Sequence, residues 1–487
     1  MPLSQLGNGA KSHQELLLVG DGEGSASSGV MKLPLESALA AVGSYADPCS
    51  FDKFRQRVPS SAVASALAAN DVATLRRRRL PLEAVLWLVI GMALFRSLPI
   101  EELVARLGLA RPGSRGKTVA PSAIPQAREH LGEGPVRSLF EAIAPAAAHA
   151  HAKDPAHRWR GFALYGIDGT TARISDTPDN RETFGGHRGR TGSGESGYPL
   201  VRIVALMALA SHLLAGVRFG PYAVGEVTYA KELWASIPND SLTLLDRAFL
   251  SAGLLVPLQR GGRNRQWMTR LKKNTRYRIL ERLGSGDWRV EFKVSAEARK
   301  KDPSLPLTFE ARVVSYRRRG YRQQKLVTSL LDPQAYPAAE LAVLYHRRWE
   351  LELGFAEIKT SMLERCETLR SKTSWGVRQE IWGLLLAYHL VRAEMATVAR
   401  TANVDATRIS FLTMLRRLRD AWSWGAVSHG ASLPPMLQQL WDEFVGLILR
   451  ARRPDRRFPR AVKIKMSKFK RKRPVTAKRR PLRKIAA

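Results

Sequence analysis

The spacing of hydrophobic positions along this chain of 487 residues is helical in its first third. From about residue 31 to 150, Ala and Leu recur at helical spacing and prolines interrupt the pattern at short intervals, which predicts a small helical domain. The apolar run at residues 84–95 is shorter than the ~20 residues that cross a bilayer, so we expect a core helix and no membrane span. Residues 1–30, rich in Gly and Ser, predict a flexible tail.

The pattern changes at Phe162, where short runs of apolar and β-branched residues are separated by polar or Gly-rich loops. The runs FALYGID, TARIS and YPLVRIVALMAL indicate strands, and SLTLLD predicts a further strand that ends at Asp246. Alternating apolar positions between about 286 and 331 indicate more strands. We therefore expect an α/β domain over residues 151–400, with a β-rich insertion at about 260–335.

Helical spacing returns in the last third of the chain. Residues 338–365 predict one long helix, and residues 377–399 predict a second that is apolar enough to be buried against the sheet. Residues 401–487 are expected to form a helical segment followed by a basic tail, because 18 basic residues and a single acid, Asp455, follow Leu449.

Charge narrows the class of partner. Lys and Arg outnumber Asp and Glu by 78 to 43, an excess that attracts polyanions and favours nucleic acid, although acidic lipid would also fit by charge alone. A basic run at residues 76–79 is either a phosphate contact or a solvated face. The two cysteines, Cys49 and Cys366, exclude a disulfide framework and a cysteine-rich zinc site. With no secretory leader pattern, we expect an intracellular protein.

The segment YHRRWELELGFAEIK carries the most specific chemistry. At about 100° per residue, four polar side chains fall on one helical stripe about 60° wide. The stripe contains Tyr345, Arg348, Glu352 and Lys359. Glu350 and Glu357 point to the other side of the helix. An ordinary amphipathic helix with an Arg348–Glu352 ion pair at its surface is the alternative, since such pairs are common four residues apart.

Two further acids favour a metal site over that alternative. Asp168 ends the run LYGID and Asp246 ends LTLLD, so two strands and a helix can bring Asp168, Asp246 and Glu352 together. Three ionised carboxylates repel one another unless cations lie between them, and oxygen ligands are those that Mg²⁺ prefers. Two such ions about 3.5 to 4 Å apart support phosphodiester cleavage. Arg348 and Lys359 would then bind DNA phosphates, and Tyr345 could hydrogen-bond one.

These residues resemble a known family. Tyr345, Arg348, Glu352 and Lys359 match at every spacing the Tyr-Arg-Glu-Lys signature of the DDE transposases of the insertion-sequence-four type. IDGTTARISDTPDN resembles the first-acid segment of that family and LLDRAF the second, with Ala248 where a Gly is common. The resemblance covers roughly residues 31 to 400.

The resemblance implies a ribonuclease H-like mixed-sheet catalytic core with a β-rich insertion, preceded by a helical DNA-binding domain at residues 31–150. It implies cut-and-paste transposition, in which double-stranded DNA is cleaved at element ends and joined to target DNA, with Mg²⁺ as the cofactor and Mn²⁺ as a substitute. A homodimer is expected in the DNA complex, and the resemblance also implies a cytoplasmic, nucleoid-associated protein of a bacterium. Some relatives flip a base onto a Trp of the insertion; for Trp267 and Trp288, packing in the core is the favoured interpretation.

Three other functions remain to be weighed. A repressor descended from a transposase would keep the basic surfaces without catalysis, and a ribonuclease H-like nuclease would hydrolyse DNA without joining it. The pair His389 and Arg392 is spaced as in a tyrosine recombinase, but no Tyr follows Tyr388, so we expect this pair to be structural.

Overall fold

The computed structural model describes residues 58–71, 80–107, 109, 119–188, 195–317, 323–364, 368–425 and 448–449. The tail predicted at residues 1–30, the basic run at 76–79 and the basic tail after residue 449 lie outside these ranges. The boundaries proposed above between domains therefore stay predictions. Among the described residues, no helix combines the length and apolar character that a membrane crossing requires.

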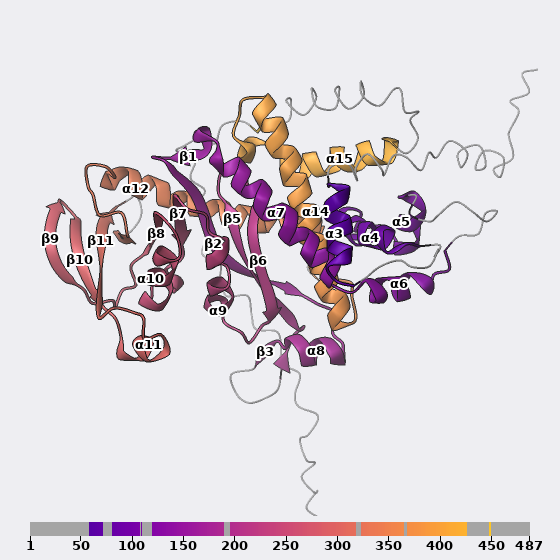
Figure 1. The fold of residues 1–487 in the computed structure, drawn as a ribbon, viewed down its shortest axis with the longest axis horizontal. Helices are drawn as coiled ribbons and strands as arrows, with labels where there is room; N and C mark the ends of the chain where they lie inside the picture. Colours follow the sequence, from indigo (N-terminus) through magenta and orange to yellow (C-terminus); the bar gives the residue numbers. More distant parts are fainter. Residues whose placement is uncertain are drawn as a thin grey trace, which may run out of the picture. The chain divides into compact units, whose positions relative to one another are not determined.

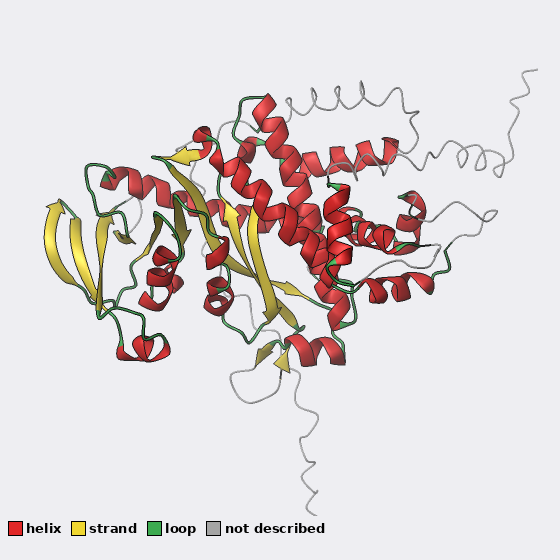
Figure 2. Ribbon diagram, viewed as in Figure 1, coloured by secondary structure: helices red, strands yellow, loops and turns green. Residues whose placement is uncertain are grey.

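A mixed sheet forms the centre of the described structure (Figures 1 and 2). Its first strands lie in the order β6-β5-β2-β7-β8, with β5 antiparallel to β2 and β6, and with β7 parallel to β2 and β8. The short β1 pairs with β2, and β3 and β4 form a separate hairpin. Their bounds are β1 Arg158–Trp159, β2 Phe162–Arg173, β3 His187–Arg188, β4 Glu195–Ser196, β5 Leu200–Ala208, β6 Leu214–Pro221, β7 Ser241–Leu245 and β8 Arg265–Arg270.

Four more strands extend the same sheet from β8, in the order β12-β11-β10-β9, each antiparallel to its neighbour. They occupy the part of the chain where a β-rich insertion is expected. The alternation in β10 places Val290 and Phe292 in the buried core while Glu291 and Lys293 remain more exposed, and in β11 residues 311–314 are all buried. The bounds are β9 Arg278–Gly284, β10 Asp287–Lys293, β11 Thr308–Tyr316 and β12 Gln324–Thr328, with the helix α11 Ala296–Lys301 between β10 and β11.

Short helices connect the strands of the sheet. Pro178 begins one of them and Thr177 caps it, since its side chain accepts from the N–H of Asn180. The connecting helices are α8 Pro178–Phe184, α9 Glu226–Lys231 and α10 Ala252–Arg260, with 3₁₀ turns η1 Pro155–His157, η2 Trp234–Ser236 and η3 Arg247–Phe249.

The N-terminal helices pack on a long helix, α14 (Ser374–Thr401), that also contacts the sheet. The ring of Trp382 in α14 lies 5.3 Å from that of Phe140 in α7 and 4.9 Å from that of Phe219 in β6, and α7 also packs directly on β6. The helix predicted at residues 84–95 is α4, and all but two of its thirteen residues are buried. The N-terminal helices are α3 Ser60–Ala68, α4 Leu82–Leu94, α5 Ile100–Arg106, α6 Ala123–Leu131 and α7 Gly134–Lys153.

Buried polar contacts also join these helices to α14. Arg96, just after α4, pairs with Glu380 at 3.2 Å, and Arg128 of α6 donates to Gln379 at 2.9 Å. Arg370 donates to the carbonyls of Met92, Arg96 and Leu98, which lie at and beyond the C-terminal end of α4. Carbonyls at the end of a helix lack partners within the helix, so the half-buried Arg370 is a suitable cap.

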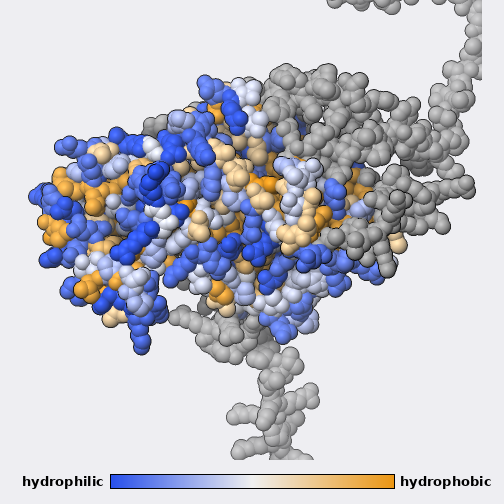
Figure 3. Space-filling view, in the orientation of Figure 1, coloured by the Kyte–Doolittle hydropathy of each residue, from blue (hydrophilic) through white to orange (hydrophobic). Residues whose placement is uncertain are grey.

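The long helix predicted at residues 338–365 is interrupted. It consists of α12 (Ala338–Tyr345), a 3₁₀ turn η4 (His346–Arg348), α13 (Trp349–Ala356) and a π-helical turn η5 (Glu357–Met362). A 3₁₀ turn tightens a helix and a π turn widens it, so the stripe drawn for an ideal helix is an approximation here. The remaining elements are η6 Ala406–Arg408 and α15 Phe411–Gly425. On the face shown in Figure 3, hydrophilic side chains predominate and hydrophobic ones are scattered among them.

Candidate active site

The parallel pairing of β2 and β7 brings two of the predicted acids side by side. The ladder between these strands ends at Ile167 and Leu245, so Asp168 and Asp246 are the next residue on each strand. The sequence predicted separate strands in FALYGID and TARIS, the first ending at Asp168, and this is wrong: one strand continues to Arg173, because residues 169–173 still pair with β5. Asp168 is therefore the first residue of β2 beyond the pairing with β7, and it still pairs with β5.

The helix that carries Glu352 lies close to β2 and to β5, the other neighbour of β2. Gly166, two residues before Asp168, allows this approach, because a Cβ there would lie 2.6 Å from a Leu351 methyl carbon. Gly354 does the same on the helix side, where a Cβ would lie 2.6 Å from the Met207 methyl carbon of β5. Two glycines thus set α13 against β2 and β5, with Glu352 between Leu351 and Gly354 in sequence.

Arg348 joins two of the three acids directly. Its guanidinium donates to Asp168 at 3.1 Å and to Glu352 at 3.0 Å, and its own side chain is largely buried. The Arg348–Glu352 pair, which the sequence also allowed as an ordinary surface ion pair, is therefore part of a larger contact: the same guanidinium also binds Asp168 on the sheet. Tyr345 is buried as well, and its hydroxyl donates at 2.9 Å to the carbonyl of Leu245, the residue before Asp246.

The negative charges of the acids influence one another. Burial raises the pKa of Asp168; the N–H of Gly169 and the charge of Arg348 oppose this, and the charges of Asp246 and Glu352 raise the pKa further. The three predicted acids therefore share one electrostatic environment, although they come from residues far apart in the chain.

A fourth carboxylate, Glu226, lies at this site and was missed in the sequence. It is the first residue of α9, and its carboxyl group packs on the backbone of Gly169, where a Cβ would lie 2.6 Å from its Cδ. Burial and the charge of Asp168 raise the pKa of Glu226. No motif marks this residue; the only signal in the sequence is the glycine after Asp168, which leaves room for it.

Comparison with known proteins identifies the family. Residues 48–141 match the family described as "Insertion element 4 transposase N-terminal", and residues 163–390 match "Transposase DDE domain". The transposase InsG for insertion sequence element IS4 of Escherichia coli (strain K12) is 37% identical over 443 residues, which cover 89% of this chain and 94% of InsG. The chain belongs to the IS4 family of DDE transposases. The function of this transposase is DNA transposition.

Two further comparisons are weaker. The putative transposase InsZ of the same organism is 36% identical over 236 residues, covering 48% of this transposase and 76% of InsZ. A piggyBac transposase synaptic complex with hairpin DNA shares 12% identity, covering 83% of this chain and 86% of its own, at a TM-score of 0.38, too low to carry an argument. The fold prediction is confirmed by the family match together with the mixed sheet: the transposase has a ribonuclease H-like core.

The acids of this transposase have the donor chemistry of a divalent metal site. DDE transposase domains in general use divalent metals, and carboxylate oxygens suit hard ions such as Mg²⁺. Asp168 and Glu352 already hold a cationic group, the guanidinium of Arg348. Within the part of the chain that the structure describes, no three His, Cys, Asp or Glu side chains are arranged as a ready metal site. The three carboxylates suit a divalent ion, and two of them, Asp168 and Glu352, are bound by the guanidinium of Arg348.

Three other predicted residues have clear positions. Lys359 lies in the π-helical turn η5 and is half-buried. Trp267 is buried in the core, where its indole N–H donates to Gln259, as the packing interpretation predicted. Trp288 in β10 is half-buried, and the Lys325 ammonium lies 5.4 Å from its ring centroid.

Proposed function

We propose that this transposase cleaves double-stranded DNA at the ends of its insertion element and joins the freed 3′-hydroxyls to target DNA in a metal-dependent reaction. Asp168, Asp246 and Glu352 are the catalytic residues in this proposal. The observation that carries it is the bridge from Glu352 through Arg348 to Asp168, beside the position where Asp246 leaves β7. The match to the DDE family supports the same assignment.

The three carboxylates would hold Mg²⁺, with Mn²⁺ as a substitute. A pair of such ions activates the attacking oxygen and stabilises the leaving oxygen of a phosphodiester. The chain's own part is to hold the three carboxylates in place from two strands and a helix. Gly166 and Gly354 support this role, since they keep that helix close to the sheet.

The basic residues of the signature would act on DNA phosphates. With metal and DNA bound, Arg348 would exchange its carboxylate partners for a phosphate oxygen, and Lys359 would bind a second phosphate. For Tyr345 the buried hydroxyl supports a different role from the phosphate contact expected from sequence. It fixes the end of β7 through Leu245 and so holds Asp246 in place.

We further propose a homodimer in the DNA complex, because each chain has one set of three acids and an element has two ends. The net charge of +35 favours binding to both element ends and target DNA, and association with the nucleoid. Light scattering of the protein with and without end DNA tests the dimer. The mass of two chains together with two DNA ends is expected. The mass of one chain on one DNA end would refute it.

The cleavage proposal is tested with purified protein and DNA that carries its own element ends, in Mg²⁺, Mn²⁺ or EDTA. Wild type should nick the ends and form joined products only with metal, whereas Glu352→Ala should bind the same DNA and do neither. Glu182→Gln, an exposed change on α8, is the matched control and should cleave normally.

The products distinguish the competing functions. Tight binding without cleavage in any metal would favour a repressor, and metal-dependent nicks without joined products would favour a nuclease that only hydrolyses. Cleavage that persists in Asp168→Ala, Asp246→Ala and Glu352→Ala would remove the acids from the reaction.

A further inference from the structure

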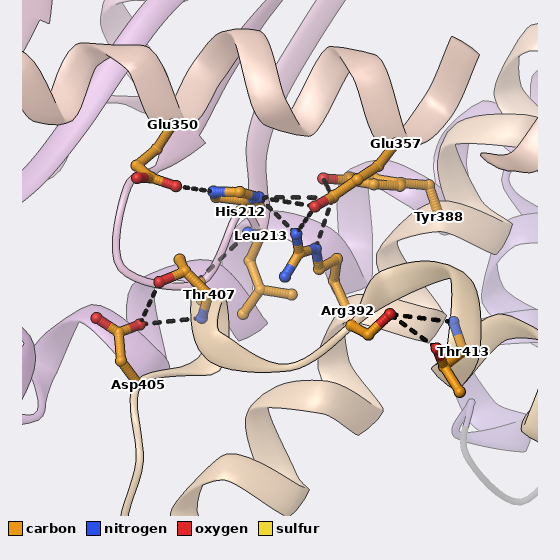
Figure 4. A network of polar contacts seen from close by, with 11 residues as sticks. His212, Leu213, Glu350, Glu357, Tyr388, Arg392, Asp405, Thr407 and Thr413 are labelled. Atoms are coloured by element: carbon orange, nitrogen blue, oxygen red, sulfur yellow. Dashed lines mark hydrogen bonds and ion pairs between the residues drawn. The ribbon is translucent and has the colours of Figure 1, made fainter. Parts of the chain in front are cut away.

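The back of the helix that carries Glu352 holds a cluster of buried charges with no role in the proposal above. Glu350 and Glu357 are seven residues apart and share one side of the helix, while Glu352 points about 160° away from Glu350. Figure 4 shows both glutamates directed at His212, with Arg392 and Tyr388 approaching from α14. We call His212, Glu350, Glu357, Tyr388 and Arg392 the back-face cluster.

The contacts of this cluster join three parts of the fold. His212 lies in the tight turn between β5 and β6, with a φ of 58° and 2% exposure, and its Nε2 is 3.1 Å from Glu350. Arg392 approaches the other ring nitrogen, Nδ1, at 2.5 Å and donates through Nε to Glu357 at 2.9 Å. The Tyr388 hydroxyl donates to the same carboxylate at 3.0 Å.

The direction of each hydrogen bond follows from the donors available. A guanidinium has donors only, so Nδ1 of His212 accepts from Arg392 and Nε2 carries the proton that is donated to Glu350. The result is one connected chain of hydrogen bonds from the β5–β6 turn, through both glutamates of the helix, to α14. The Arg392 guanidinium also lies 5.4 Å from the Phe411 ring centroid, so apolar packing fixes it from a further side.

Stability alone does not account for such a cluster. Buried ion pairs lose most of their attraction to the cost of desolvation, and well-packed apolar residues of similar size are often as stable. What the cluster adds is a fixed orientation of the helix that carries Glu352. The apolar side of the helix, with Leu351, Phe355 and Ile358, would tolerate a small rotation or shift, whereas charge-assisted hydrogen bonds to both Glu350 and Glu357 would not.

We propose that the back-face cluster sets the rotation and height of α13 and η5, and so positions Glu352 against Asp168. His212, Glu357 and Arg392 are thus positioning residues for DNA cleavage. This inference rests on the proposed function, because it assumes that Glu352 acts in the reaction. The π-helical turn begins at Glu357, where the back-face contacts to α14 are made. A π turn at such a place is typical of functional helices.

The test compares Glu357→Gln with a matched variant that breaks another buried ion pair. Asp287→Asn separates Asp287 from Arg312, which is fully buried in β11. Asp287 lies in β10, four strands from β7, or about 19 Å at the usual strand spacing. Both variants should lower the melting temperature. Cleavage of end DNA is then measured in a single turnover, at saturating DNA and at a temperature where every variant is folded.

Glu357→Gln is expected to reduce the cleavage rate roughly 10- to 100-fold with DNA affinity unchanged, because a misplacement of about 1 Å costs that much. Asp287→Asn should cleave at the wild-type rate. Arg392→Lys keeps the charge but loses the fixed fork of donors, so it should also be slow. If Glu357→Gln does not fold, Tyr388→Phe, which removes one contact to Glu357, takes its place with a smaller reduction.

Two results would overturn the inference. One is a folded Glu357→Gln or Arg392→Lys protein that cleaves at the wild-type rate; the other is an equal loss of cleavage in Asp287→Asn. If the proposed function itself were wrong, the result would be distinguishable, because Glu352→Ala would still cleave DNA.

Discussion

Replacing Arg348 with Gln should tighten metal binding by the DNA-free protein while it weakens DNA cleavage. Arg348 neutralises Asp168 and Glu352 from 3.1 Å and 3.0 Å. An incoming metal ion has to displace this guanidinium from the two carboxylates. Glutamine keeps much of the length of the side chain and removes the charge, so no cationic side chain at this position competes with the metal ion for the two carboxylates.

The two contacts set the magnitude. A hydrogen bond to a charged group contributes about 1.5 to 3 kcal/mol, which applies to Asp168, whose side chain is 21% exposed. The Glu352 side chain is 39% exposed, so that contact is discounted to about 0.2 to 1 kcal/mol. The lower limits of the two contacts add up to about 1.7 kcal/mol, which corresponds to at least about tenfold in metal affinity.

Calorimetric titration with Mn²⁺ in the absence of DNA measures this effect. Arg348→Gln should bind the ion about tenfold more tightly than wild type. Arg160→Gln, which removes an exposed pair with Glu340, is the control and should leave the affinity unchanged. The same variant should cleave DNA more slowly, since it lacks the proposed phosphate contact. Equal or weaker metal affinity in Arg348→Gln would refute the idea that the guanidinium and the metal compete.

Three further predictions concern stability. Although burial favours its protonated form, the charge of Arg392 and the hydrogen bonds that the carboxylate accepts hold the pKa of Glu357 below its usual range, so its ionised form stabilises the fold above about pH 4.5 and that contribution is lost as the pH falls toward the lowered pKa. Denaturation curves of wild type and Glu357→Gln should therefore converge in acid; a constant difference would contradict this. Gly383→Ala should lower the melting temperature despite the better helix former, because its Cβ would lie 2.7 Å from the carbonyl oxygen of Val89; a rise would contradict the close approach of α14 to α4. Glu380→Gln leaves Arg96 buried without its counter-ion, at a cost of about 3 to 5 kcal/mol, and limited proteolysis should then release the N-terminal helices; an unchanged digestion pattern would show that apolar packing suffices.

Local patterns were enough to predict that the three acids of the candidate site lie close together. Asp168 and Asp246 each follow an apolar run, and parallel pairing of those runs places the two acids together. The spacing from Tyr345 to Lys359 singled out Glu352 from its neighbours Glu350 and Glu357, and the latter two do lie on the other side of the helix.

Contacts between distant segments could not be predicted in this way. The joining of the runs FALYGID and TARIS into one strand depends on β5, which pairs with β2 without interruption across the polar residues between the two runs. The burial of Tyr345 depends on a carbonyl one hundred residues earlier, at Leu245. Glu226 reaches the site only because α9 packs on β2 and β5. The π turn at Glu357 arises within an unbroken amphipathic pattern, and nothing in that pattern marks it.

The way in which the four outer strands join the sheet has a consequence for engineering this enzyme. Strand β12 pairs with β8, so β9–β12 protect what would otherwise be the open edge of the sheet two strands from β2. An exposed edge of unpaired N–H and C=O groups is a template for aggregation. Deletion of the segment between β8 and α12 is therefore expected to give an aggregation-prone protein rather than a minimal catalytic core. A smaller version of the enzyme would have to retain β12 or replace it with another strand that pairs with β8.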